Sequence, residues 1–179
     1  MPKSIPKKSY AGLQRGSSDA IELLAIGRVR SPHAERFGTP HQAVLPADPA
    51  QRPNEEAHIE LFAERVPAAA LQDLAGFSHV WVIAYLHLNH GYRPLVAPPR
   101  DPDRKHGVLA TRAPHRPNPL GLSAARLLAV SGHRLTLERL DLLDGTPVLD
   151  IKPYVPYADA FPAARIGWLE DLPEPNTQS

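Results

Sequence analysis

The sequence contains no cysteine among its 179 residues. This absence excludes disulfide bonds, thiolate zinc sites, iron–sulfur clusters and a cysteine nucleophile. It is typical of a protein in a reducing compartment, so we expect a cytoplasmic location. The sequence also lacks an apolar run close to the roughly 20 residues of a membrane-spanning helix. Its first residues include lysines but no apolar stretch of the secretory kind, so we expect no signal peptide.

Proline, by contrast, is abundant, with 21 residues. Because proline interrupts helix interiors, this content excludes a bundle of long helices. The formal net charge is only +1, but the charges are unevenly distributed. Residues 93–116 hold six Lys/Arg and two Asp, whereas residues 138–179 hold eight Asp/Glu and three Lys/Arg. A few arginines in one basic segment can position an RNA backbone without making the whole protein basic.

Short alternating or apolar runs, bounded by proline and glycine, predict strands. They cover residues 21–30, 57–62, 79–86, 107–110, 122–130, 134–143 and 148–151. The alternation slips at Glu138-Arg139, where we expect a β-bulge. One short helix is expected at residues 67–74, ended by Gly76. Proline-rich loops are expected at residues 33–53, 91–106 and 153–162.

These elements predict a mainly β fold, a small and partly open antiparallel β-barrel with one or two short helices and long proline-rich loops. A Rossmann fold is excluded, because strands and helices do not alternate regularly and no GxGxxG or Walker motif is present. We expect a single domain over residues 21–172. A flexible extension at residues 1–20 precedes it, and a frayed terminus at residues 173–179 follows.

Histidines and a serine motif offer weaker alternatives. His79 and His87 have an even spacing, which places them on one face of a strand and suggests a metal hydrolase. No HExxH motif is present and the spacing implies no third ligand, so we expect no metal. The stretch that includes Ser123 begins like a nucleophile elbow, but Ala125 stands in place of the second glycine.

Two segments combine polar side chains with prolines that fix the backbone. In residues 110–123, Pro117 and Pro119 hold Arg116 and Asn118 in extended geometry. This display suits an active site, and it equally suits a stiff connection between strands. In residues 141–154, the turn at Asp144 can present a carboxylate and backbone N–H groups to a ligand, or can be an ordinary hairpin turn.

Together these segments resemble the two signatures of the TsaA-like (YaeB/TrmO) family. The resembling stretches are RPNPLGLS at residues 116–123 and DGTPVLDIKPY at residues 144–154. Four further stretches follow the family in the same order, namely residues 27–32, 37–42, 77–81 and 93–100. The resemblance therefore covers about residues 21–160. His41 and Leu88 depart from the family pattern, at positions where relatives have a basic and a polar residue.

The resemblance implies a homodimeric, S-adenosylmethionine-dependent methyltransferase with a small β-barrel core. Bacterial members of the family methylate N6 of threonylcarbamoyl-modified adenosine beside the anticodon of threonine tRNA. S-adenosylmethionine is thus the expected cofactor and the tRNA anticodon loop the expected partner. The cofactor positions carried over from the family are Gln42, Ala43, Val44, His87, Leu88, Arg112, Leu122, Asp144, Gly145, Thr146 and Pro147.

Catalytic and RNA contacts are expected from the same segments. We expect Asn118 or Asp150 to accept a proton from the target amine, and Lys152 or Tyr154 to position the base. Arg93, Arg100 and Arg116 are expected to contact RNA phosphates. The alternative is a non-catalytic β-barrel module that binds RNA or a small ligand through the same loops.

Overall fold

The computed structural model describes residues 21–33, 56–138 and 140–173. Its strands are β1 (Gly27–Arg30), β2 (Glu56–Leu61), β3 (His79–Tyr85), β4 (Leu95–Val96), β5 (His106–Gly107), β6 (Leu120–Ser131), β7 (Arg134–Glu138) and β8 (Pro147–Pro153). Its helical elements are α1 (Pro156–Asp159) and the 3₁₀ helices η2 (Ala68–Leu71), η3 (Leu74–Gly76), η4 (Val108–Ala110) and η5 (Gly167–Asp171). The predicted calls at residues 1–20 and 174–179 lie outside the described residues.

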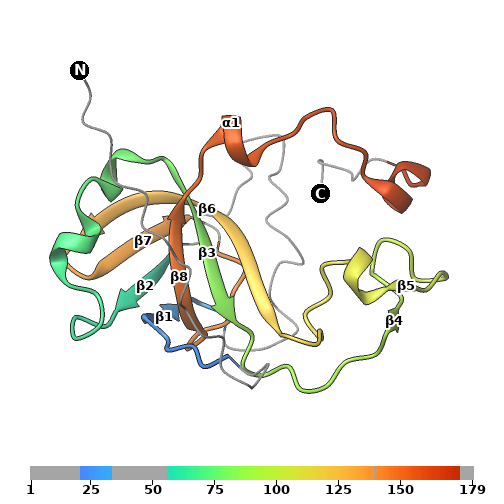
Figure 1. Cartoon of the computed structure of the whole chain (residues 1–179), viewed down its shortest axis with the longest axis horizontal. Helices are drawn as coiled ribbons and strands as arrows, with labels where there is room; N and C mark the ends of the chain where they lie inside the picture. Colours follow the sequence, from blue (N-terminus) through green and yellow to red (C-terminus); the bar gives the residue numbers. More distant parts are fainter. Residues whose placement is uncertain (1–20, 34–55, 139, 174–179) are drawn as a thin grey trace, which may run out of the picture.

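Six strands form a closed antiparallel barrel in the order β1-β2-β7-β6-β3-β8 (Figure 1). The predicted mainly β, non-Rossmann fold is confirmed. The barrel was expected to be partly open, but β8 pairs with β3 along one edge and with β1 along the other, so the sheet closes. Closure leaves no unpaired edge on these strands, which removes a site of edge-to-edge aggregation.

The barrel interior is filled by the inward-facing residues of each strand. Side chains of a strand alternate between its two faces, so every second residue points inside. The pattern is plainest in β3, where Val80, Val82 and Ala84 are fully buried and the residues between them are not. Aliphatic side chains also supply the rest of this core, including Val29, Ile59, Leu135, Leu137 and Val148.

An arm, residues 86–119, leaves the barrel after β3 and returns before β6. It carries the small sheet of β4 and β5 and projects to one side of the barrel (Figure 1). At its root the Leu86 N–H donates to the Pro119 carbonyl oxygen at 2.8 Å. The helix η5 comes from the C-terminal part of the chain and lies beside this arm (Figure 1). Residues far apart in the sequence therefore meet outside the barrel.

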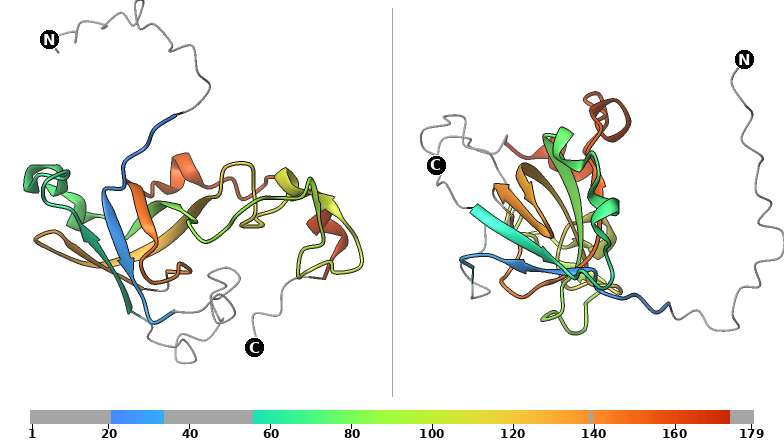
Figure 2. Two further views of the ribbon diagram at one scale, coloured as in Figure 1. Left: turned by 90° about the horizontal axis from the view of Figure 1, so that it is seen from below. Right: turned by 90° about the vertical axis from the view of Figure 1, so that its left-hand side faces the viewer.

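Three local predictions are wrong. The expected helix at residues 67–74 is two 3₁₀ helices, η2 and η3, because Asp73 between them takes a left-handed φ of 65° that an α-helix cannot continue. The expected strand at residues 107–110 is mostly η4, since only Gly107 of that stretch pairs with β4. The strand expected from residue 21 begins at Gly27; Ile26 still hydrogen-bonds to Val148 and Phe62, and residues 21–24 are exposed and lead away from the barrel (Figure 2).

The bulge expected at Glu138-Arg139 falls on a position outside the described residues, and a bulge occurs in the neighbouring strand. The extra residue lies in β6, where Leu127 pairs with Leu137 and Ala129 with Thr136, which leaves Leu128 without a cross-strand partner. β7 keeps a regular register as far as Glu138, and residue 139 lies outside the described residues. Two shorter elements, β4 and α1, occur where loops alone were expected. In the part of the chain that the structure describes, no helix has the length and apolarity to span a membrane.

A glycine at the start of β1 is required by close strand packing. A Cβ atom at Gly27 would lie 2.6 Å from the Glu60 backbone oxygen on β2. We predict that Gly27→Ala lowers the free energy of unfolding by about 1–3 kcal/mol, because the two paired strands must separate. Denaturant unfolding measures this change. Gly76→Ala is the matched control, since its Cβ meets nothing within 4 Å; an equal loss in both variants would contradict the packing argument.

Candidate functional site

Four strand ends meet at one end of the barrel, which we call the site end. Tyr85, the last residue of β3, lies opposite Leu120, the first residue of β6. Beside them, β8 begins at Pro147, opposite Arg28 of β1. The arm is rooted at this end. The site end thus gathers the predicted cofactor positions of the arm root and of the Asp144 turn, whereas Gln42, Ala43 and Val44 lie outside the described residues.

The Asp144 turn is fastened to the end of β1 by its own backbone. The Asp144 N–H donates to the His33 carbonyl oxygen and the Gly145 N–H to that of Val29, both at 2.9 Å. These N–H groups are therefore not available to a ligand, and the expectation that the turn presents them is wrong. Gly145 has a φ of 74°, which the turn requires and glycine tolerates. Thr146 is 2% exposed, so its side chain belongs to the barrel.

The Asp144 carboxylate is the exposed polar group of this turn. One oxygen accepts a hydrogen bond from the Ser31 N–H at 3.2 Å, and the other lies 3.9 Å from the Arg30 guanidinium. Arg30 is nearer to Glu60, at 2.8 Å, and this hydrogen bond raises the pKa of Arg30 above its usual value. The pairing of Arg30 with Glu60 leaves the Asp144 carboxylate, with its side chain 43% exposed, able to meet a cationic or hydroxyl ligand.

An apolar patch surrounds the root of the arm. Tyr85 and Leu120 are 41% and 43% exposed, and Leu122, on the same outer face of β6, is 56% exposed. Leu88, three residues after Tyr85, is 54% exposed. Exposed apolar side chains grouped next to polar residues mark a binding surface more often than an ordinary protein surface. The patch consists of Tyr85, Leu88, Leu120 and Leu122.

A row of side chains crosses the outer face of the barrel beside this patch. Ile83 of β3 lies opposite Leu122 of β6 on one side and opposite Asp150 of β8 on the other. Directly opposed residues in antiparallel strands share a face. With neighbouring strands about 4.8 Å apart, Leu122 and Asp150 are about 10 Å from each other. The structure therefore brings one predicted cofactor residue and one predicted catalytic residue onto the same surface.

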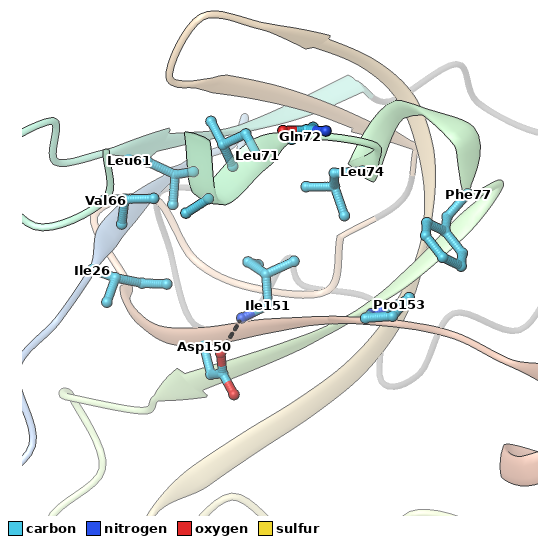
Figure 3. Close-up of a pocket in the computed structure, with 11 residues that line it drawn as sticks. Ile26, Leu61, Val66, Leu71, Gln72, Leu74, Phe77, Asp150, Ile151 and Pro153 are labelled. Carbon is cyan, nitrogen blue, oxygen red and sulfur yellow. Dashed lines mark hydrogen bonds between the residues drawn. The ribbon is translucent and has the colours of Figure 1, made fainter. Parts of the chain in front are cut away.

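Asp150 forms an ion pair with Lys152 at 2.8 Å and also accepts the Ile151 N–H at 2.9 Å. The side chains of Asp150 and Ile151 lie on opposite sides of β8, and that of Asp150 is outside the barrel interior (Figure 3). Both members of the ion pair remain partly exposed, so solvent reaches them. Asp150 and Lys152 are thus placed where a bound molecule can meet both charges.

Tyr154 and Asn118 are not brought together. The Tyr154 N–H donates to the His79 carbonyl oxygen at 3.1 Å, and its ring packs 5.3 Å from the Trp81 ring. These contacts place Tyr154 beside the first residues of β3. Asn118 lies at the arm root, beyond the last residue of β3. The length of β3 separates them by roughly 20 Å. His79 and His87 likewise flank opposite ends of β3. No cluster of three metal-ligating side chains occurs among the described residues.

Two of the three predicted RNA-binding arginines donate to backbone oxygens. The Nη1 group of Arg116 donates to the carbonyl oxygens of Val108, Thr111 and Ala113, at 3.2, 2.7 and 3.5 Å. Arg100 donates to the Pro173 carbonyl oxygen. Arg93 and Arg112 are exposed. Arg116 therefore holds the bend of the chain that presents Arg112, a contact that composition and proline spacing did not reveal.

A polar pair that sequence reasoning missed lies on the inner side of β6. The Ser123 hydroxyl donates to the Asp141 carboxylate, and the Ser31 hydroxyl donates to the Leu142 carbonyl oxygen at 2.8 Å. Both contacts hold the segment that leads into the Asp144 turn. Asp141 was visible in the sequence as one of three carboxylates near the turn, but nothing in the sequence paired it with Ser123.

The other end of the barrel holds an apolar cavity of about 370 Å³. Leu71, Leu74 and Phe77 face it from the loop that covers this end, Leu61 from the end of β2 and Ile151 from β8 (Figure 3). Its lining is mainly aliphatic; Asp150 also borders it, with its carboxylate directed away from it (Figure 3).

These features define a class of protein. It is a closed six-stranded antiparallel barrel with its candidate site at one end of the barrel. A proline-rich arm, an acidic turn and exposed apolar side chains form this site. It shares neither the parallel sheet nor the glycine-rich loop of doubly wound nucleotide-binding folds.

The chain belongs to the family of the tRNA-methyltransferase O N-terminal domain, whose model matches residues 28–160. It is 41% identical over 161 residues to the tRNA (adenine(37)-N6)-methyltransferase of Escherichia coli, an alignment that covers 86% of this chain and 66% of that protein. It is 43% identical over 145 residues to a Pyrococcus abyssi protein named "Probable S-adenosyl-L-methionine-binding protein", with 81% of this chain and 74% of that protein covered.

The fold matches solved structures of the same family. The crystal structure of TrmO from Pseudomonas aeruginosa superposes with a TM-score of 0.67 at 40% sequence identity, and the match covers 83% of this chain and 62% of that one. The chain therefore spans about two thirds of the length of these bacterial relatives. The matched part contains the whole barrel and the arm.

Proposed function

We propose that this protein is an S-adenosylmethionine-dependent methyltransferase that acts on N6 of threonylcarbamoyl-modified adenosine next to the tRNA anticodon. The observation that carries the proposal is the 41% identity to the E. coli tRNA (adenine(37)-N6)-methyltransferase over 161 residues. The name of the P. abyssi relative supports the choice of cofactor. The family match, residues 28–160, includes the Asp144 turn and the arm.

The side chains at the site end fit the chemistry of S-adenosylmethionine. When bound, this cofactor supplies a methyl group on a positively charged sulfonium. The apolar patch offers Leu122 and Tyr85 to an adenine ring or an aliphatic chain, as in most ligand sites. The Asp144 carboxylate can accept ribose hydroxyls or face the positive charge, and the Arg112 guanidinium can pair with a carboxylate.

For the reaction itself, this chain has to orient the target amine and remove a proton. The adenine N6 lone pair forms the new N–C bond, the electron pair of the broken S–C bond stays on sulfur, and one proton leaves N6. We choose Asp150 as the acceptor, because the strand register sets it in one row with Leu122. Asn118, at the arm root of the site end, is the alternative. Lys152, 2.8 Å from Asp150, keeps that carboxylate oriented. Transfer is direct, because the chain has no cysteine to carry a methyl group.

The arm supplies the cations for tRNA. Arg93, Arg104, Lys105 and Arg112 are exposed on it, whereas Arg100 and Arg116 donate to carbonyl oxygens. Exposed cations on a projecting element suit phosphates, which fix the register of an RNA. We include in the proposal a homodimer, as the family resemblance implies, and a cytoplasmic location, where tRNA is found. Light scattering of the purified protein measures the molar mass and so tests the homodimer.

Cofactor binding tests the enzyme against the non-catalytic barrel module. We predict that calorimetry with S-adenosylmethionine shows a micromolar Kd and that Asp144→Ala weakens it about tenfold, since one charge-assisted contact is lost. Asp103→Ala, an exposed carboxylate of the arm, is the control and should keep the wild-type affinity. Absence of binding at about 1 mM cofactor would favour the module instead.

Asp150→Asn tests the proton acceptor. The amide keeps the shape of the side chain but lacks the charge, so we predict that kcat for tRNA methylation falls about 100-fold while the cofactor Kd changes less than about twofold. Asp73→Asn is the matched control, because Asp73 lies beyond the other end of the barrel, next to η3. A kcat within about threefold of wild type would remove Asp150 from the chemistry.

The salt dependence of tRNA binding tests the arm. We predict that the double variant Arg104→Ala/Lys105→Ala binds tRNA more weakly. The plot of log K against log salt should also become less steep, by about one unit of slope for each lost phosphate contact. Arg134→Ala, an exposed arginine of β7, removes a charge from the barrel wall away from the arm and should leave the slope unchanged. Equal slopes for wild type and the double variant would place the RNA elsewhere.

A further inference from the structure

The bend of the chain that contains Arg112 buries few apolar side chains. This bend, the Arg112 loop, comprises residues 108–113. Val108 is buried, but Leu109 is 76% exposed. The arm itself joins the barrel at a single narrow root. Segments with few buried apolar side chains open readily, so the order of such a loop depends on its polar ties.

Polar ties within the arm account for part of that order. The Thr111 hydroxyl donates to the Val108 carbonyl oxygen at 2.9 Å and accepts the Ala113 N–H at 3.3 Å. Arg116 then donates to three carbonyl oxygens of the loop, as described above. These contacts hold the loop together, and the Val108 N–H also donates to the Pro94 carbonyl oxygen at 2.9 Å, next to β4. All of these partners belong to the arm itself.

Trp168 connects the Arg112 loop to η5, an element outside the arm. Its indole N–H donates to the Ala110 carbonyl oxygen at 2.8 Å, across 58 positions of the chain. Its ring stacks on the His106 ring, with centroids 4.1 Å apart and planes 23° apart. The His106 side chain is 8% exposed and its Nε2 lies 2.9 Å from an Asp101 carboxylate oxygen. One indole therefore joins the Arg112 loop to β5.

The element that carries Trp168 is itself well formed. Gly167, with a φ of 63°, turns the chain into η5, and the Glu170 carboxylate accepts the Ile166 N–H at 2.9 Å. The Arg100 guanidinium donates to the Pro173 carbonyl oxygen, just past the end of η5. Trp168 lies beyond the family match, which ends at residue 160.

We propose that Trp168 is a positioning residue, which fixes the Arg112 loop to η5 and so holds the Arg112 guanidinium, a cofactor position carried over from the family resemblance, in one place. The coupling to cofactor binding rests on the proposed function, whereas the fixing of the loop does not. Trp168 touches the carbonyl of Ala110 and not the ligand. Its loss should therefore act through the geometry of Arg112, since small displacements of a positioning group weaken binding.

The test separates the two functions of the indole. Trp168→Phe keeps an aromatic ring for stacking and loses the N–H donor, whereas Trp168→Ala loses both. Phe161→Ala is the control, a 74% exposed aromatic residue of the same C-terminal segment. The first readout is hydrogen exchange of the Thr111 and Ala113 amides in the free protein, because both amides are hydrogen-bonded in the loop.

We expect exchange at these two amides to rise about tenfold or more in Trp168→Ala and by a smaller factor in Trp168→Phe, with no change in Phe161→Ala. The second readout is the cofactor. We expect the Kd for S-adenosylmethionine to rise about tenfold in Trp168→Ala, while kcat at saturating cofactor stays within about twofold.

Unchanged hydrogen exchange at both amides in the two Trp168 variants would contradict the proposal that Trp168 fixes the Arg112 loop. Faster exchange with an unchanged cofactor Kd would overturn the positioning role. If the wild-type protein binds no S-adenosylmethionine, the proposed function fails, and the exchange measurement still decides whether Trp168 fixes the Arg112 loop. Trp168→Phe keeps the test valid if the alanine variant does not fold.

Discussion

Everything at the candidate site depends on the pairing of β8 with two strands at once. β8 lies between β3 and β1, and this double pairing closes the barrel. It fixes the Asp144 turn against the end of β1, and it sets Asp150 opposite Ile83 on the outer face. The register between β8 and β3 shifts between Ile83 and Ala84, so β8 carries one more residue than β3 there. Such an irregularity bends a strand and redirects its side chains.

The barrel positions a polar and apolar surface without the devices of the common nucleotide-binding folds. There is no glycine-rich loop, and the N–H groups of Asp144 and Gly145 are already paired with β1. What remains for a ligand are side chains: the Asp144 carboxylate, the apolar patch, Arg112 and the Asp150–Lys152 pair. The proposed methyl transfer uses these groups mainly to orient two reactants, which is the largest contribution that a rigid site can make to such a step.

The sequence predicted those features that follow from local pattern. The strands β2 and β7 were predicted from the alternation of apolar residues, β3 from an apolar run with β-branched and aromatic residues, and the turn at Asp144 from its Asp-Gly pair. Pattern failed where tertiary contacts decide: Asp73 breaks a segment with helical composition, and the bulge at Leu128 of β6 had no sequence signal.

Composition also does not show which partners a side chain will contact in the folded protein. The Nη1 group of Arg116 donates to carbonyl oxygens of the arm, and Trp168 had no local signal at all because its partners lie some sixty positions away. The family resemblance located the cofactor segments, but only the strand register shows that Asp150 and Leu122 share a face.

The central claim is methyl transfer to one adenosine of tRNA. The most direct measurement incubates the full chain with methyl-labelled S-adenosylmethionine and threonine tRNA that carries the threonylcarbamoyl modification, followed by digestion and mass spectrometry of the nucleosides. The account predicts one labelled methyl group on N6 of the modified adenosine beside the anticodon, and none on tRNA that lacks an adenosine there. Label on another nucleoside, or none on any tRNA under conditions where the cofactor binds, would contradict it.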